Sequence, residues 1–273
     1  MPEGHTIHRA AREQREILVG QTVRASSPQG RFTDAARLDR ARLESIDAHG
    51  KHLFYSFRAP RSRALRILHV HLGLAGKFRW RASPPPEPRG AVRLRLVTTD
   101  KTLDLSGPLV CELIDEPMME SIRARLGPDP LIARTTATPF ARRLATTRAA
   151  IGTTLLDQEI IAGLGNVYRA ELLFLARIDP RRPSSALTPD EVRGLWDVAR
   201  RLLRAGVDTG RIATIDVALP GAAKAVSLAV PSGRGRHRRT FVYKQRTCRV
   251  CSTAITSAKL AGRPCFYCPH CQR

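Results

Sequence analysis

Four cysteines near the end of the chain place the strongest constraint on how it can fold. They form two pairs with the spacing C-x2-C, Cys248 with Cys251 and Cys268 with Cys271, and sixteen residues separate the pairs. In a reducing compartment this arrangement is typical of one zinc ion held by four thiolates. Zinc binding supplies roughly 10–16 kcal/mol of apparent folding free energy to a small module. The spacing therefore predicts one structural zinc ion in a C-terminal finger.

Two alternatives to this ligand set remain open in the sequence. The cysteines can instead form two redox C-x2-C pairs, although no thioredoxin-like βαβ pattern surrounds them. Cys265 and Cys268 also have the required spacing, but the Pro-His dipeptide between Cys268 and Cys271 fits the tight turn between two ligands. With the second choice, Cys265 and Cys111 are expected to be buried as small apolar side chains.

The charge of the chain indicates a polyanionic partner. Its 273 residues include 46 basic and 24 acidic ones, a net charge of +22, and forty of the basic residues are arginine. A surplus of this size makes nucleic acid the default partner. No apolar run approaches the ~20 residues of a membrane-spanning helix, and a basic and then apolar signal peptide is missing from the N-terminus. We therefore expect a cytoplasmic, nucleoid-associated protein with reduced thiols and no membrane partner.

The first residues, Met1-Pro2-Glu3-Gly4, allow two interpretations. Proline in a first turn and an early acid are typical of a helix start, which is the simpler reading of four residues. If Met1 is removed, however, Pro2 carries a free secondary amine that can form an iminium with an electrophilic carbon. An α-amino group titrates near pH ~8, so a useful fraction is unprotonated near neutral pH. Glu3 would lie beside it as a proton donor and acceptor.

The N-terminal half is predicted to be rich in β-strands. Residues 4–19 first form a helix, and residues 22–110 then contain alternating apolar and polar side chains. The segment 67–80 begins as a strand and breaks at its two glycines. We expect an antiparallel domain that closes near the turn Gly127-Pro128-Asp129-Pro130.

Residues 135–206 are predicted to be helical. The last helix begins with a capping box, Thr188 with Glu191 around Pro189, and continues with an apolar stripe. The stripe consists of Val192, Leu195, Trp196, Ala199, Leu202 and Leu203. Residues 209–237 form a loop rich in small residues, and a basic run next to the zinc module is expected to face phosphate. The run consists of Arg234, Arg236, Arg238 and Arg239.

A glycine-rich turn between two helical segments predicts an anion site. Gly163 and Gly165 flank the turn, and Asn166 is a natural N-cap for the helix that follows. The amides at a helix start bind anions, and the asparagine adds a side-chain donor for a phosphate. A purely structural corner between helices explains the same turn.

Five motifs in a fixed order now point to one family. They are Pro2-Glu3-Gly4-His5, Gly50-Lys51-His52, His71-Leu72-Gly73-Leu74-Ala75-Gly76, Ile161-Ala162-Gly163-Leu164-Gly165-Asn166 and Cys268-Pro269-His270-Cys271-Gln272. With them, the chain resembles, from end to end, the formamidopyrimidine-DNA glycosylase and endonuclease VIII family of bifunctional repair enzymes. The resemblance implies an α+β fold: an N-terminal antiparallel β-sandwich flanked by helices (residues 1–133), a helical helix–two-turns–helix domain (134–237) and a four-cysteine zinc finger hairpin (238–273).

The resemblance also implies a role for each motif residue. Pro2 is the nucleophile that attacks C1′ of the damaged nucleotide, and Glu3 is the general acid and base. Lys51, at a hairpin tip, completes the catalytic set and contacts phosphate beside the lesion. Asn166 grips phosphate in the helix–two-turns–helix motif, and Arg263 contacts phosphate from the finger.

Two further residues belong to the implied DNA interface. Leu74 occupies the family's wedge position, where an apolar side chain fills the gap left by an extruded base. Its alternative is a loop leucine packed inward. His71 either approaches a phosphate of the DNA backbone or is a strand histidine whose hydrogen bonds are all made within the protein.

One departure from the family concerns the damaged base. The 8-oxoguanine branch adds an arginine and a phenylalanine from a second loop, and residues 104–108 contain neither. This favours the endonuclease VIII branch, which prefers oxidised pyrimidines such as thymine glycol and 5-hydroxyuracil. We expect a monomeric glycosylase and lyase of base excision repair that acts through a proline Schiff base and β,δ-elimination.

Three other readings stay open at this stage. They are a glycosylase of the same family that prefers oxidised purines, a non-catalytic zinc-containing nucleic-acid-binding protein, and a cation-rich ribosome-associated protein. The preferred DNA is expected to be a damaged duplex, with single strands and bubbles left open.

Overall fold

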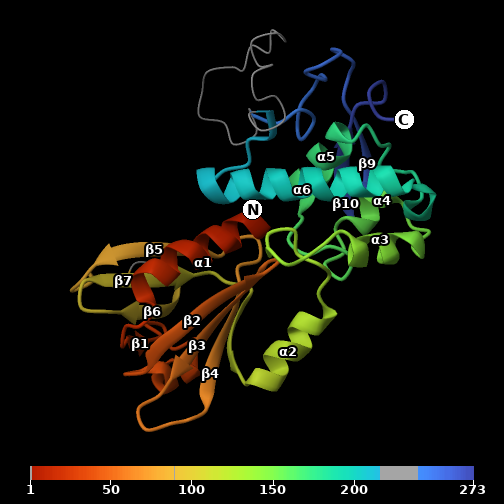
Figure 1. The fold of residues 1–273 in the computed structure, drawn as a ribbon. Helices are drawn as coiled ribbons and strands as arrows, with labels where there is room; N and C mark the ends of the chain where they lie inside the picture. Colours follow the sequence, from red (N-terminus) through yellow and green to blue (C-terminus); the bar gives the residue numbers. More distant parts are fainter. Residues whose placement is uncertain (1, 89, 216–238) are drawn as a thin grey trace. The chain divides into compact units, whose positions relative to one another are not determined.

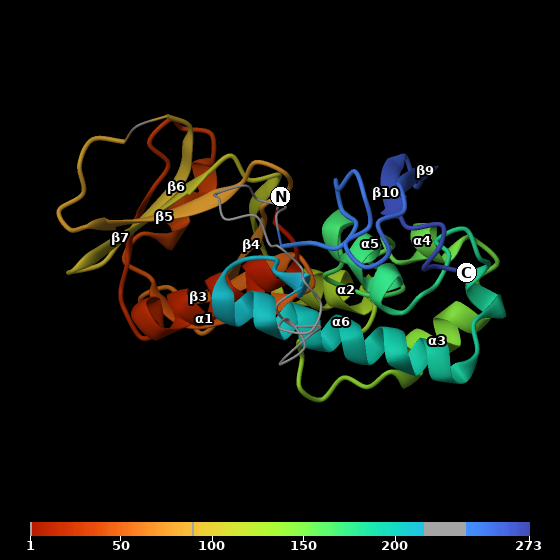
Figure 2. The same ribbon diagram turned by 90° about the horizontal axis from the view of Figure 1, so that it is seen from above.

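The structure is a computed structural model that describes residues 2–88, 90–215 and 239–273. These residues form two compact units, one within residues 1–125 and the other within residues 126–273. The first unit contains two antiparallel sheets, and the second contains helices and a two-stranded hairpin (Figures 1 and 2). This confirms the predicted α+β class.

The first unit is a β-sandwich with a helix at each end of its sequence. Its elements are α1 (Gly4–Leu18), β1 (Arg24–Ser26), η1 (Thr33–Leu38), β2 (Arg42–His49), β3 (His52–Arg58), β4 (Leu65–His71), β5 (Lys77–Ala82), β6 (Val92–Val97), β7 (Lys101–Ser106), β8 (Val110–Ile114) and α2 (Glu116–Arg125). One sheet has the order β1-β6-β7-β5 and the other the order β2-β3-β4-β8. The predicted break in segment 67–80 is confirmed as the loop between β4 and β5.

The two sheets share one apolar core. Because side chains alternate between the two faces of a strand, every second residue of a strand points into this core. In β3, Leu53, Tyr55 and Phe57 belong to this core, whereas Phe54 belongs to a second cluster on the opposite face. Helix α1 buries two polar side chains, His5 and Gln14, and Gln14 Oε1 accepts from the Tyr55 hydroxyl at 2.6 Å.

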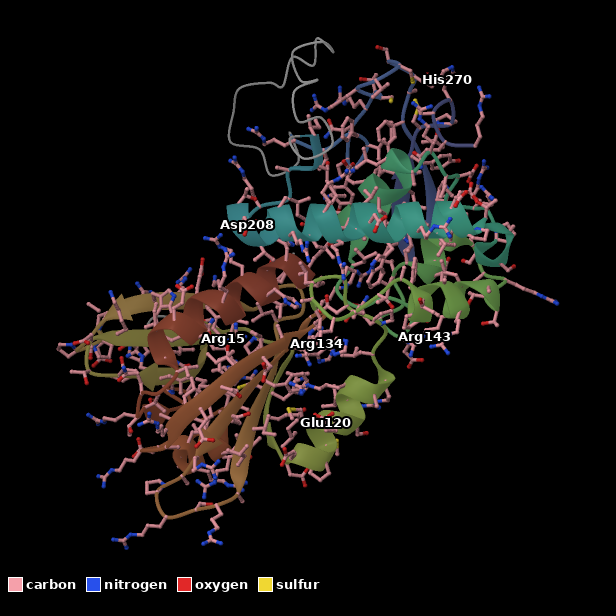
Figure 3. All side chains as sticks on the ribbon, in the orientation of Figure 1. Arg15, Glu120, Arg134, Arg143, Asp208 and His270 are labelled. Carbon is pink, nitrogen blue, oxygen red and sulfur yellow. The ribbon has the colours of Figure 1, made fainter. Side chains whose placement is uncertain are left out.

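Helix α1 packs on the sheet that contains β2 and β3. Its buried positions Ile7, Ala11 and Leu18 recur at helical spacing, as predicted. Arg15, labelled in Figure 3, donates from Nη2 to the carbonyl of Ile46 in β2 at 2.5 Å. The start of α1 is therefore carried on a helix fixed to the sandwich.

Helix α2 covers the outer face of the same sheet. Met119 and Ile122 pack against Phe54 and Ile67, and the Arg123 guanidinium lies 5.1 Å from the centre of the Phe54 ring. No helix was predicted for this segment from its residue pattern. The segment has only two buried positions, so its apolar periodicity is too short to be recognised.

The second unit is built around two packed helices. Its elements are α3 (Thr138–Ala145), α4 (Ile151–Thr154), α5 (Asn166–Leu175), η2 (Ser184–Ala186), α6 (Pro189–Thr209), β9 (Thr256–Leu260) and β10 (Arg263–Tyr267). The predicted capping box is confirmed, because Glu191 N donates to Thr188 Oγ1 at 3.2 Å and Thr188 N donates to Glu191 Oε2 at 2.7 Å. The predicted apolar stripe of α6 is buried throughout.

The hairpin β9–β10 packs against α5 through its apolar side chains. Cys265 is fully buried in the core of this unit, as expected for a small apolar side chain. Cys111, in contrast, is only half-buried at the edge of the sandwich core, so that expectation was wrong. Among the described residues, no helix combines the length and the apolar composition that crossing a membrane requires.

Candidate functional site

The start of α1 places Pro2 and Glu3 together at a helix N-terminus. Pro2 is half-buried, and Glu3 is the N-cap residue with its side chain fully buried. The Glu3 carbonyl accepts from Thr6 N at 2.9 Å, but its side chain makes no capping hydrogen bond to the first turn. Glutamate is not among the residues that usually cap a helix with their side chain, and helix capping therefore does not account for the buried carboxyl group of Glu3.

Lys51 lies in a two-residue turn between β2 and β3. The strands pair up to His49 and His52, which leaves Gly50 and Lys51 as the whole connection. Gly50 has a φ of +57°, a conformation that glycine adopts without the strain of a Cβ. The sequence prediction of a lysine at a hairpin tip is thus matched by the structure.

Leu74 lies at the tip of the β4–β5 loop with 69% of its surface exposed. The inward-packed alternative is therefore wrong. The loop is tightly built, because Gly73 has a φ of +62° and a Cβ on it would lie 2.8 Å from Leu109 Cβ. Leu109 is itself 71% exposed, so two solvent-facing leucines flank the same turn. Leu109 was not predicted as a site residue from the sequence.

Behind Lys51, a chain of hydrogen-bonded side chains crosses three strands. Glu112 in β8 accepts from His69 Nδ1 at 2.9 Å, and His69 Nε2 lies 2.8 Å from His52 Nδ1. The His71 ring stands edge-on to His52 at 4.9 Å, and its Nδ1 accepts from Gly73 N at 3.1 Å. His71 is therefore engaged in the loop that presents Leu74.

These contacts define the protonation of the histidines. Because Glu112 accepts a hydrogen bond from the Nδ1–H of His69, neutral His69 carries no hydrogen on Nε2 and accepts there. His52 must then donate from Nδ1. Burial lowers the pKa of His52 to about 3, helped by the nearby His71, and burial also lowers the pKa of His69 and His71. The rings are therefore neutral at pH 7, and Lys51 supplies the positive charge at this edge.

In the second unit, Asn166 opens α5 after the glycine-rich turn. It was predicted as the N-cap, but Gly165 holds that position and Asn166 is the first helical residue. Its side chain is used elsewhere: Nδ2 donates to the Pro264 carbonyl at 3.1 Å, and Oδ1 accepts from the buried guanidinium of Arg169. These partners come from β10 and from the next turn of α5, which no local pattern reveals.

Arg263 is exposed at the first position of β10. The turn before it contains Ala261 and Gly262, with φ values of +49° and +70°. Arg263 pairs with Leu260 across the hairpin, so its side chain projects from the base of a tight turn.

Four sulfur atoms converge at the end of the chain. The Sγ atoms of Cys248, Cys251, Cys268 and Cys271 all lie within 4.8 Å of one another. The separations Cys251–Cys271, Cys251–Cys268 and Cys248–Cys271 are 3.4, 3.5 and 3.9 Å. These distances exclude disulfides, and tetrahedral ligands ~2.3 Å from one ion lie ~3.8 Å apart. The four thiolates fit a tetrahedral metal ion, with His270 in the turn of the second pair (Figure 3).

Two features of the sequence analysis lie outside the described residues. They are Met1 and most of the basic run, namely Arg234, Arg236 and Arg238. Residues 209–215, at the start of the loop, are described, as is Arg239 after it.

Comparison with known proteins places the chain among DNA repair enzymes. Residues 1–108 match the formamidopyrimidine-DNA glycosylase N-terminal domain, and residues 126–217 match the formamidopyrimidine-DNA glycosylase H2TH domain. The chain is 41% identical over 279 residues to endonuclease 8 1 of Mycobacterium tuberculosis, covering 100% of both chains. It is 34% identical to formamidopyrimidine-DNA glycosylase of Thermosynechococcus vestitus, covering 94% of this chain and 88% of that one.

Solved structures share the fold of the whole chain. Lactococcus lactis Fpg (MutM) in complex with DNA that contains N7-benzyl-Fapy-dG aligns with a TM-score of 0.78 and 23% identity over 100% of both chains. The same protein bound to DNA with an oxidised pyrimidine aligns with a TM-score of 0.77.

Proposed function

Because the chain belongs to the formamidopyrimidine-DNA glycosylase family, we propose that it is a DNA glycosylase and AP lyase of base excision repair that removes oxidised bases. The observation that carries the proposal is the pairing of Pro2 with a buried Glu3 that does not cap its own helix. Binding to DNA would also associate the protein with the nucleoid.

Pro2 is the proposed nucleophile, once Met1 has been removed. Its nitrogen is then a secondary amine at the positive end of α1, where the helix dipole lowers the pKa of an amine. Attack on C1′ breaks the glycosidic bond, and the departing base leaves with the bonding electrons and takes up a proton. Glu3 donates a proton to the ring oxygen, so the sugar opens to an iminium between C1′ and Pro2.

Elimination follows from the electron demand of the iminium. The iminium acidifies C2′, whose proton is lost while the C3′–O bond breaks and the 3′ phosphate departs. A second elimination removes a proton from C4′ and breaks the C5′–O bond, so that the 5′ phosphate departs with the bonding electrons. Water then hydrolyses the iminium, which releases the sugar fragment and regenerates the amine. Because the histidines behind Lys51 are neutral, the Lys51 ammonium group is the proposed cation for a phosphate at the β2–β3 turn.

Two separate sets of residues are proposed to hold the DNA. In the first unit, Lys51 contacts phosphate and Leu74 fills the gap left by the extruded base, for which its 69% exposure makes it available. In the second unit, Asn166 and Arg263 contact phosphate. The finger, proposed as a module over residues 238–273, holds one structural zinc ion on its four cysteines. All four tetrahedral positions are then occupied by protein, so no water can bind the metal.

Oxidised pyrimidines are the proposed substrates. Residues 104–108 contain no arginine or phenylalanine, and identity is higher to the relative named endonuclease 8 than to those named formamidopyrimidine-DNA glycosylase. The leucine that flanks the Leu74 loop, Leu109, offers only apolar surface to the opposite strand.

The test is borohydride trapping on duplexes that carry thymine glycol, 8-oxoguanine or an abasic site. The wild-type protein should form a covalent complex, fastest with thymine glycol among the two base lesions. Pro2→Gln should abolish trapping but bind the abasic duplex within about threefold of wild type. Glu3→Gln should slow base excision at least a hundredfold, whereas Glu16→Gln, an exposed acid on the same helix, should not.

Each alternative gives a different result in this panel. Faster release of 8-oxoguanine would identify a purine-directed enzyme of the same family. Trapping that survives Pro2→Gln would refute the nucleophile, and tight binding with no trapping at all would identify a non-catalytic nucleic-acid-binding protein.

A further inference from the structure

Arg169 in α5 is a completely buried arginine. Its guanidinium donates from Nη1 to the carbonyls of Gly152 at 2.8 Å and Leu260 at 3.1 Å. From Nη2 it donates to the carbonyls of Pro264 at 3.2 Å and Arg263 at 3.4 Å, and to Asn166 Oδ1. One cation thus connects α4, α5 and both strands of the finger hairpin.

The first consequence concerns the Asn166 amide. Because Arg169 has only donors, it can accept nothing, and the oxygen of the amide must face it. The NH2 group must then lie on the other side, where one N–H is donated to the Pro264 carbonyl. The amide carries a second N–H, which is the donor that a phosphate would use. A flipped amide would set its NH2 group against the guanidinium.

The second consequence concerns the turn that presents Arg263. Leu260 and Arg263 are paired across this turn, and Arg169 holds the carbonyls of both. The main chain at the first residue of β10 is therefore held to the first turn of α5 through the Arg169 side chain. The Arg263 side chain itself is exposed, so its direction follows from the backbone that Arg169 holds.

We infer that Arg169 is a positioning residue for DNA binding: it sets the Asn166 amide and the Arg263 turn at one fixed spacing, so that both reach phosphates of the same strand. This inference rests on the proposed function, because only there do Asn166 and Arg263 contact DNA. A residue that merely filled the interior would affect folding and leave the number of phosphate contacts unchanged.

The experiment measures binding of an abasic-analogue duplex by fluorescence anisotropy across a range of salt concentrations. Arg169→Lys keeps the charge but cannot reach five acceptors, since an ammonium group lacks the fork of a guanidinium. It should raise Kd about tenfold and reduce the slope of log K against log salt by ~0.9, the value for one lost phosphate contact. Arg263→Gln should reduce the slope equally, and the double variant should lose no more than either one.

Arg200→Lys is the matched control. Arg200 lies in the same unit and also donates to main-chain carbonyls, those of Pro130 and Thr135, but away from the finger. Arg200→Lys should leave the slope unchanged, and its trapping rate at saturating DNA should stay within about twofold of wild type.

Each outcome decides the inference. A lower melting temperature for Arg169→Lys with an unchanged slope would overturn it. If Arg169→Lys does not fold, a double-mutant cycle of Asn166→Ala and Arg263→Gln tests the inference instead. Additive losses of DNA-binding free energy would show that the two contacts are not coupled and would overturn it. A wild-type protein that neither binds nor traps the duplex would instead refute the proposed function.

Discussion

Replacing Glu171 by glutamine should destabilise the second unit. Glu171 is completely buried in α5, and its two oxygens accept four hydrogen bonds. Oε1 accepts from the amides of Val242 and Tyr243, both at 2.9 Å, and Oε2 accepts from the Phe241 amide at 2.7 Å and from the Thr214 hydroxyl. The carboxylate therefore joins the residues on both sides of segment 216–238 to α5.

The size of the effect follows from what an amide can accept. Glutamine has one carbonyl oxygen, which can replace Oε1 and keep two amide donors. Its NH2 group then faces Thr214, whose hydroxyl can turn to accept, and Phe241, whose N–H cannot. The buried Phe241 N–H, left without an acceptor, costs about 1–3 kcal/mol. The hydrogen bonds from the Val242 and Tyr243 amides lose their charged acceptor, at about 1 kcal/mol each. Burial raises the pKa of Glu171, so removing the charge offsets part of this loss. The net cost is about 3 kcal/mol.

Thermal unfolding followed by circular dichroism measures this cost. For a unit of this size, about 3 kcal/mol corresponds to a fall in Tm of roughly 10 °C. Glu159→Gln is the control, because Glu159 is an exposed acid of the same unit. A shift below about 2 °C for Glu171→Gln would show that the four donors do not depend on a charged acceptor.

Three other expectations can be checked separately. Leu74→Ala should slow excision from a duplex about thirtyfold, which corresponds to about 2 kcal/mol of lost apolar contact, and Tm should not change because Leu74 is exposed; a lower Tm would make it a packing residue. Burial lowers the pKa of His5 to about 4. Between pH ~6.5 and 4, His5 is therefore protonated in the unfolded chain but neutral in the folded chain. Stability should therefore fall by about 3 kcal/mol as the pH drops from 6.5 to 4, and urea titrations that show less loss for wild type than for His5→Asn would contradict this. Metal analysis should find one zinc ion per chain, and removal of the zinc by a chelator should weaken DNA binding. A folded chain purified without metal would refute the proposed zinc site.

The sequence predicts well the features that are encoded locally. The capping box at Thr188, the helix after Pro2, the break at Gly73 and the four cysteines each depend on residues within one turn or one motif. In each case a few neighbouring residues carry the whole physical reason, whether a hydrogen bond, a period or a ligand spacing.

Features that depend on distant partners were missed or misplaced. From the sequence, Arg169 and Glu171 belong to the exposed face of a helix, yet most of their hydrogen-bond partners lie about 70 to 95 positions later in the chain. Glu112 meets His69 only because β4 and β8 are neighbours in the sheet. Asn166 was assigned as a cap because the partner that claims its amide, Pro264, is 98 residues away.

The two buried charges of α5 hold their neighbours mainly by main-chain atoms. Arg169 binds carbonyl groups of the hairpin, and Glu171 binds the amides of residues 241–243. Every amino acid has a carbonyl, and every one except proline has an amide hydrogen. Side chains on these segments can therefore diversify, by natural drift or in a designed library, while the framework beneath them stays in place. Proline at positions 241–243 is the substitution that such a library should leave out.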